Sequence, residues 1–273
     1  MVVGRNNRLA RLVLPVVSAI VGGIVIFPLL WMVVSAFKTQ AESYLVPPRI
    51  FPQNPSFSAF REVLTETTLP NFIANSAIVG ISTTLLVACL SVMAVFSLTR
   101  VRVPGAELIA RSTLIFYTMP PILLVVPVVQ LFLDIGLVNT LYALIVAYTG
   151  LYLPLGVWIF RGYVNGLDPS LEQAAMLDGL SMFQAFFRIG LREALPGLAV
   201  VAFFTFNATW NEFLYASLLI QKEKLMTMPA GLASFIGVFN VYSWPMLMAA
   251  GIIAVTPIFI FYLIVEKRAR EAL

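Results

Sequence analysis

Six apolar segments dominate this sequence, and each is long enough to cross a lipid bilayer, which takes roughly 20 residues. Only 11% of the 273 residues are charged and 60% are hydrophobic, whereas soluble domains carry about 25% charged residues. We therefore expect an all-α membrane protein with six transmembrane helices. The predicted spans are Leu12–Phe37, Phe72–Leu98, Leu108–Leu133, Val138–Phe160, Leu195–Ile220 and Met246–Val265.

The first apolar run follows several arginines, as the core of a signal peptide does. It is too long for a signal peptide, however, and no small-x-small cleavage site follows it, so we expect a retained span. The predicted organisation is a cytoplasmic N-terminus at 1–11, a transmembrane domain at 12–266 with a cytoplasmic loop at 162–196, and a short cytoplasmic tail at 267–273.

The distribution of Lys and Arg predicts the orientation, because positive residues gather in cytoplasmic loops. Twelve of the 17 fall on the side of the two termini: Arg5, Arg8, Arg11, Arg100, Arg102, Arg111, Arg161, Arg188, Arg192, Lys267, Arg268 and Arg270. Five fall on the other side: Lys38, Arg49, Arg61, Lys222 and Lys224. We therefore expect both termini and the 162–196 loop to face the cytoplasm.

The stretch Asp168–Pro196 predicts two short helices joined by a turn. Asp168 is suited to cap the first helix, with Pro169 at its first position. Asp178 and Gly179 are suited to end it, because glycine readily adopts the left-handed conformation found after a helix.

The second helix of this stretch begins at a capping-box pattern, Ser181 followed by Gln184, and is expected to run through Phe186, Phe187 and Ile189. A helix of roughly ten residues is marginal in water by itself. Such a helix either lies on lipid headgroups and neighbouring loops or docks a cytosolic partner, and the spacing alone leaves both open.

Two segments on the opposite side of the membrane are long. Lys38–Asn71 contains five prolines and is expected to be extended rather than helical. Gln221–Pro245 carries interleaved aromatic residues, which form either an interfacial belt or a contact for an external protein. These aromatic residues are Phe235, Phe239, Tyr242 and Trp244.

Ionisable residues inside spans are functional candidates. Glu212 lies in the fifth predicted span together with Asn207 and Asn211. These three side chains either line a polar cavity for a hydrogen-bonding solute or tie the span to a neighbouring helix. Asp134 is at the outer end of the third span. Prolines in the third and fourth spans predict bent helices.

Several chemistries are excluded by the sequence. No G-x-x-x-x-G-K-[ST] phosphate loop occurs, there is no histidine, and the single cysteine, Cys89, is expected to be a buried small hydrophobe. There is no metal-ligand cluster, no nucleophile–base arrangement and no row of buried carboxylates. A membrane protein with a cavity but no energy source of its own either conducts passively or draws its energy from a partner chain, and the predicted cytosolic helix pair favours the second.

The chain resembles the permease subunits of binding-protein-dependent ABC importers, in the sugar-type branch of maltose, trehalose and glycerol phosphate importers. The cytoplasmic signature of that family, Glu-Ala-Ala followed by Asp-Gly, stands here as Gln173–Leu180, with Ile189–Arg192 after it. The resemblance covers nearly the whole length. It also rests on Phe27–Trp31, Phe37-Lys38, Asn75-Ser76, Leu137–Thr140, Leu153-Pro154 and Trp210–Phe213.

This resemblance implies a type I (MetI-like) ABC importer permease fold in the bacterial cytoplasmic membrane. It implies that the loop is a coupling helix that fits a cleft on a cytosolic ATPase, and that this chain is not itself an enzyme. The implied partners are a second homologous permease, two ATPase subunits that hold ATP and Mg, and an external solute-binding protein. The implied coupling residues are Glu172, Gln173, Ala174, Ala175, Asp178 and Gly179.

The chain departs from the family pattern in three places. Gln173 replaces the usual Glu, although Glu172 beside it offers a carboxylate to an ATPase arginine; Arg192 replaces the usual Pro; and the tail lacks a Gly-rich ending. Two other classes stay open. These are an ion-coupled secondary transporter that uses Glu212, and a membrane scaffold whose loop only docks. The solute is not readable, since an external protein would select it.

Overall fold

The computed structural model describes residues 7–101, 104–237 and 243–271, without the side chains at 7–12, 114, 116, 265 and 267–271. Of the predicted N-terminus at 1–11 and tail at 267–273, the structure therefore describes only the backbone of 7–11 and 267–271. Within the described part the chain forms helices and no strands. It divides into two units, residues 1–67 with 235–255 and residues 68–234 with 256–273.

Four helices in the described residues are long and apolar enough to cross a membrane singly. They correspond to the first, second, fourth and sixth predicted spans. They are α1 (Asn7–Ala36), α4 (Leu69–Arg100), α7 (Leu141–Asn165) and α14 (Trp244–Glu271).

The third and fifth predicted spans are each broken into two helices, so the expectation of one helix per segment is wrong there. The third becomes α5 (Ala106–Thr118) and α6 (Pro121–Asp134). It breaks at Pro120 and Pro121, which lack the N–H that a continuing helix needs. The fifth becomes α11 (Leu195–Trp210) and α12 (Leu214–Leu219).

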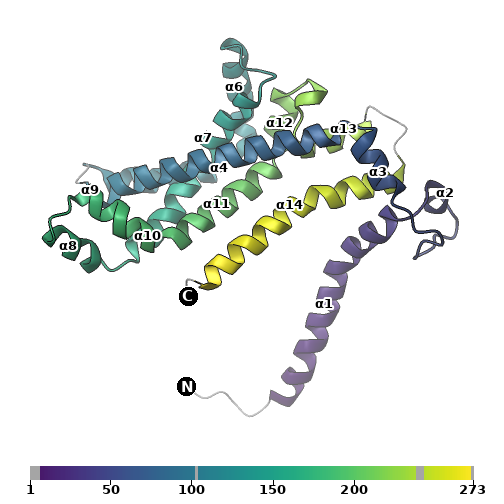
Figure 1. The fold of residues 1–273 in the computed structure, drawn as a ribbon, viewed down its shortest axis with the longest axis horizontal. Helices are drawn as coiled ribbons and strands as arrows, with labels where there is room; N and C mark the ends of the chain where they lie inside the picture. The colour runs from purple at the N-terminus through teal and green to yellow at the C-terminus, as the bar shows by residue number, and fades with distance from the viewer. Residues whose placement is uncertain (1–6, 102–103, 238–242, 272–273) are drawn as a thin grey trace. The chain divides into compact units, whose positions relative to one another are not determined.

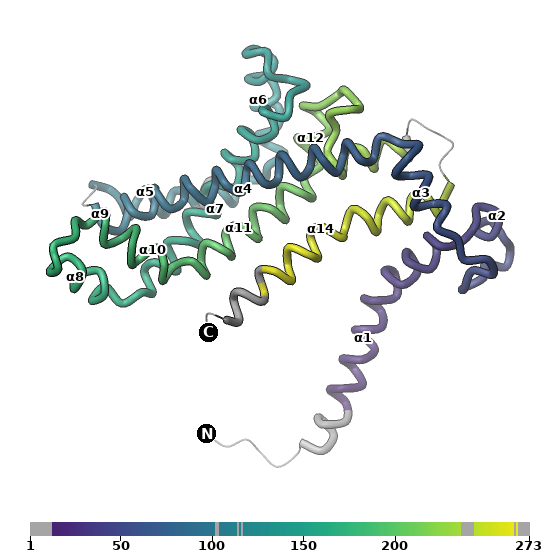
Figure 2. The backbone as a smooth tube through the Cα atoms, in the orientation of Figure 1, coloured from purple at the N-terminus to yellow at the C-terminus, as the bar shows by residue number. Residues whose placement is uncertain are grey.

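In the second unit, α4, α7 and α11 lie side by side, with α5 against α7 (Figure 1). Buried side chains such as Val87, Phe160 and Val201 fill the space between the three helices. Three short helices lie at the Arg100 end of α4 (Figure 2): α8 (Ser170–Leu177), α9 (Met182–Ala185) and α10 (Leu191–Glu193). The opposite end of α4 is called here the Leu69 end.

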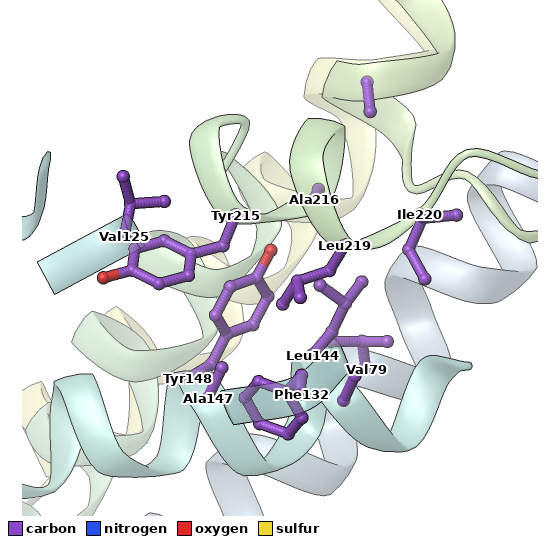
Figure 3. Close-up of a cluster of buried hydrophobic side chains, with 12 residues drawn as sticks. Val79, Val125, Phe132, Leu144, Ala147, Tyr148, Tyr215, Ala216, Leu219 and Ile220 are labelled. Carbon is purple, nitrogen blue, oxygen red and sulfur yellow. The ribbon is translucent and has the colours of Figure 1, made fainter. Parts of the chain in front are cut away.

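A second cluster of buried side chains joins α7 to the broken helices (Figure 3). Tyr148 and Leu144 of α7 meet Tyr215 and Leu219 of α12, and Phe132 reaches the cluster from α6. Tyr148 and Tyr215 are almost completely buried. The short helices α6 and α12 are therefore held by packing against α7 rather than by length.

In the first unit, the segment Lys38–Asn71 contains two helices, α2 (Gln40–Ser43) and α3 (Ser58–Thr65), so the prediction of an extended loop is wrong in part. Thr39 and Glu42 form a capping box that starts α2. The helix α3 falls in a proline-free stretch.

The side chain of Lys38 is buried within the first unit, where Nζ donates to the Arg49 carbonyl at 2.6 Å and lies 4.5 Å from the centre of the Trp31 ring. Cys89 is exposed on α4 rather than buried, because it points away from the helices that pack on α4. The prediction of a buried cysteine is wrong.

The aromatic residues of Gln221–Pro245 have different surroundings. Phe235 is buried and Trp244 is half exposed, whereas Phe239 and Tyr242 lie outside the described residues. The choice between an interfacial belt and a partner contact stays a prediction.

Candidate functional site: the α8–α10 loop and the α7–α12 cavity

The start of α8 follows the sequence prediction closely. The Asp168 carboxylate accepts a hydrogen bond from the Ser170 backbone N–H at 2.9 Å, and this bond lowers the pKa of Asp168 below its ordinary value. The helix begins at Ser170, one residue later than predicted. Asp168 therefore satisfies one of the free N–H groups at this helix end.

The end of α8 is a Schellman motif around Gly179. The backbone N–H of Leu180 donates to the Ala175 carbonyl, and that of Gly179 donates to the Met176 carbonyl, both at 3.1 Å. Gly179 has a φ of +93°, a conformation that costs little only for glycine. The predicted left-handed stop is confirmed.

The second helix starts at the predicted capping box. Ser181 Oγ accepts from the Gln184 N–H at 3.3 Å, and Gln184 Oε1 accepts from the Ser181 N–H at 3.0 Å. The chain then passes through α9 and a π-helical turn at Phe186–Gly190 before α10. The helical segment Met182–Glu193 meets α11 at an angle of 70°.

The exposed and buried faces of α8 are distinct. Gln173, Ala174, Leu177 and Asp178 are exposed, and Leu177 is 88% exposed. Glu172 and Ala175 face the protein and are buried. Four of the six predicted coupling residues, Gln173, Ala174, Asp178 and Gly179, are therefore accessible to a partner, and two are not.

The Glu172 carboxylate already has a partner in its own chain. Arg100, the last residue of α4, donates from Nε to Glu172 Oε2 at 2.7 Å and from an Nη to Oε1 at 2.8 Å. Such a two-pronged pair is the strong form of the Arg–carboxylate interaction. The Arg100 guanidinium also lies 5.7 Å from the centre of the Phe186 ring.

The second feature is a cavity of about 800 Å³ between α5–α6, α7 and the α11–α12 break. Its lining includes three tyrosines, Tyr117, Tyr152 and Tyr215, together with Asn211 and Glu212. Asn207 is not in the lining. Its carbonyl and Oδ1 instead accept hydrogen bonds from the Asn211 amide at 2.8 and 3.2 Å.

Glu212 has a capping role beside this cavity. Its carboxylate accepts from the backbone N–H groups of Tyr215 at 2.9 Å and Ala216 at 3.1 Å, at the start of α12. It also accepts from the Tyr148 hydroxyl of α7. Glu212 therefore lines the cavity and also ties α12 to α7, and the binding of a solute in this cavity stays a prediction. Asp134 accepts from Gln130 at 2.8 Å in its own helix.

Comparison of this chain with known protein families identifies the family to which it belongs. Residues 100–271 match the family described as the binding-protein-dependent transport system inner membrane component. The chain belongs to this family. The inner membrane ABC transporter permease protein YcjP of Escherichia coli K12 is 29% identical to this chain, over 92% of this chain and 90% of YcjP.

One further relative and one solved structure each match nearly the whole of this chain. The trehalose/maltose transport system permease protein MalG of Thermococcus litoralis is 31% identical over 96% of this chain and 95% of MalG. A solved bacterial ABC transporter involved in the import of the acidic polysaccharide alginate has a TM-score of 0.84 at 19% identity, over 98% of this chain and 99% of its own. The type I permease fold expected from the sequence is confirmed.

Arg100 of α4 was not identified from the sequence as a residue that binds the α8–α10 loop. A basic residue is common in the last turn of a helix, because it stabilises the negative end of the helix dipole. Nothing in the position of Arg100 therefore indicated that it also binds Glu172. Glu172 is 72 positions away, and no local pattern joins the two residues.

Proposed function

We propose that this inner membrane component is one of two permease subunits of an ATP-driven importer for a sugar. Its exposed α8 helix docks on a cytosolic ATPase subunit, and an external solute-binding protein delivers the solute. The observation that carries the proposal is α8 itself, an eight-residue helix with defined caps whose accessible face, with Leu177 88% exposed, has nothing in this chain to cover it in the described part.

The orientation follows from charge. The side of the membrane that holds the loop 162–196 carries twelve of the 17 Lys and Arg residues, so we place the Arg100 end of α4 and both termini in the cytoplasm. The Leu69 end then faces outward, towards the solute-binding protein.

The contact surface for the ATPase consists of Gln173, Ala174, Leu177, Asp178 and Gly179. The small residues Ala174 and Gly179 allow a close approach, while Leu177 supplies apolar area for a cleft. ATP and Mg belong to the ATPase chain. Glu172 and Ala175 support this surface from inside.

A sugar is the favoured solute for two reasons. Relatives of this chain are named for the transport of trehalose/maltose, trehalose, diacetylchitobiose and sulfoquinovosyl glycerol. The cavity also combines aromatic faces with hydrogen-bonding groups, Asn211 among them, and such mixed linings suit a polar ring compound.

The geometry of Glu212 also disfavours the ion-coupled alternative. Three donors, from Tyr148, Tyr215 and Ala216, already occupy most of the roughly four acceptor positions of its carboxylate and commit it to holding α12 against α7.

The test is reconstituted transport. The chain is purified with its partner permease and ATPases, placed in liposomes, and supplied with the solute-binding protein and labelled trehalose, maltose or diacetylchitobiose. Uptake that needs both ATP and the binding protein supports the proposal. Uptake that survives ATP depletion and collapses with an ion gradient would contradict it.

A further inference from the structure

The helix α4 is unusual among the long helices of this chain. In the part of the chain that the structure describes, α1, α7 and α14 each contain an interior proline, while α4 has one only in its first turn. Prolines inside a helix remove a backbone bond and allow bending. The 32 residues of α4 form a rod about 48 Å long at 1.5 Å per residue.

The Arg100 end of this rod holds the coupling loop. Its fork with Glu172 fixes both oxygens of the carboxylate, and the guanidinium side chain is only 19% exposed. Gly190 makes room for this pair. A Cβ added at Gly190 would clash with Glu172 Oε1, so a larger residue would displace the carboxylate.

The Leu69 end of the rod holds the segment 221–228. Asn75 donates from Nδ2 to the carbonyls of Lys224 and Met226 at 2.9 and 3.0 Å, and Ser76 Oγ accepts from the Met228 N–H at 2.7 Å. Thr68 adds a bond to Glu223 at 2.7 Å. The exposed side chains of Lys222 and Lys224 lie in this segment.

We propose that Arg100 is a positioning residue that joins α8 to α4, so that movement of α8 on the ATPase is carried along α4 to the segment 221–228. This inference rests on the proposed function, which places the ATPase at one end of α4 and the solute-binding protein at the other. The ion pair is the rigid link between α8 and α4. Because both ends of α4 are clamped by side chains rather than by packing alone, a displacement at one end reaches the other without a bend.

The same contacts connect the segment 221–228 back to α8, so the ion pair also carries the effect of the binding protein to the ATPase. Disabling it lowers the dependence of ATP hydrolysis on the binding protein. A merely structural ion pair would change the yield or thermal stability of the complex and leave that dependence intact.

The experiment measures ATP hydrolysis by the complete complex in lipid nanodiscs, with and without the solute-binding protein, which is supplied with trehalose, maltose and diacetylchitobiose in turn as probe sugars. The variants are Arg100→Lys, which keeps the charge and loses the fork, Glu172→Gln, and the exchanged pair Arg100→Glu with Glu172→Arg. The matched control is Arg111→Lys, which alters an exposed ion pair with Glu107 in α5.

The expected result is stimulation of several fold in the wild type and in Arg111→Lys, a ratio near one in Arg100→Lys and Glu172→Gln, and partial recovery in the exchanged pair. Wild-type stimulation in both single variants would overturn the inference. Low yields of the variant complexes, with wild-type stimulation in the complex that is recovered, would assign the pair to folding and overturn the inference as well. Absence of stimulation in the wild type would instead contradict the proposed function.

Discussion

Gly190 lies directly against the carboxylate of Glu172, at a distance that leaves no space for a Cβ atom. The contact brings the π-helical turn at Phe186–Gly190 onto the inner face of α8. It explains why a glycine occupies a buried helical position, where it normally costs about 1 kcal/mol relative to alanine.

Gly190→Ala is therefore expected to act like a loss of the ion pair. The added methyl displaces the Glu172 carboxylate and breaks at least one prong of its fork with Arg100. Stimulation of ATP hydrolysis by the binding protein should fall several fold. Gly162→Ala is the control, because nothing lies within 4 Å of a Cβ at that helical position. Equal stimulation in the two variants would contradict the expectation.

Gly179→Val should weaken docking of the ATPase. A β-branched residue at a φ of +93° strains the Schellman turn by at least about 1–2 kcal/mol, which loosens the end of α8. The measurement is the amount of ATPase that co-purifies with the chain in mild detergent. Gly179→Asn tolerates the left-handed conformation better and should retain most of it. Loss in both variants or in neither would sink this account of Gly179.

Asn139, which lies two residues before α7, holds the start of the segment 221–228, because its Oδ1 accepts from the Gln221 and Lys222 N–H groups at 2.7 and 3.1 Å. Its φ is +62°. Asn139→Ala should destabilise the protein by about 1–3 kcal/mol, seen as a midpoint of thermal unfolding a few degrees lower. Asn139→Asp keeps the acceptor and should melt close to the wild type. A smaller loss in the Ala variant than in the Asp variant would argue against this role.

Glu212→Gln separates the capping role from ion coupling. Glutamine keeps an acceptor for the N-terminus of α12, so ATP-driven uptake is expected to stay within about twofold of the wild type. Glu212→Ala leaves the Tyr148 hydroxyl and two backbone N–H groups without their acceptor and should cost about 1–3 kcal/mol of stability. Abolished uptake in the Gln variant, with the complex intact, would restore the ion-site reading.

The parts of this structure that could be predicted from the sequence are those fixed by neighbouring residues. Asp168, Gly179 and the Ser181–Gln184 box act over three or four positions, so their roles are legible in the order of residues. The break between α11 and α12 was missed because the apolar residues on both sides of Asn211 and Glu212 together make one segment long enough to cross a bilayer. The contacts that define two helices there, the Glu212 cap on α12 and the packing of α12 on α7, are visible only in the structure.

Contacts between residues far apart in the sequence could not be predicted, for a different reason. Glu172 was expected to face the ATPase, since its position in the motif suggested an exposed carboxylate. Which face of α8 is covered depends on where the end of α4 and the turn at Gly190 come to lie. The tertiary fold sets that arrangement, and no spacing in the sequence encodes it.

The central claim, that α8 docks on an ATPase, is tested most directly at Leu177. A photo-crosslinking amino acid at this position, 88% exposed at the end of α8, is activated in native membranes and its adducts are identified by mass spectrometry. The control is the same label at Leu85, which is 60% exposed on α4. The account predicts a P-loop ATPase joined to position 177 and not to position 85. Adducts at 177 with lipid alone would contradict it.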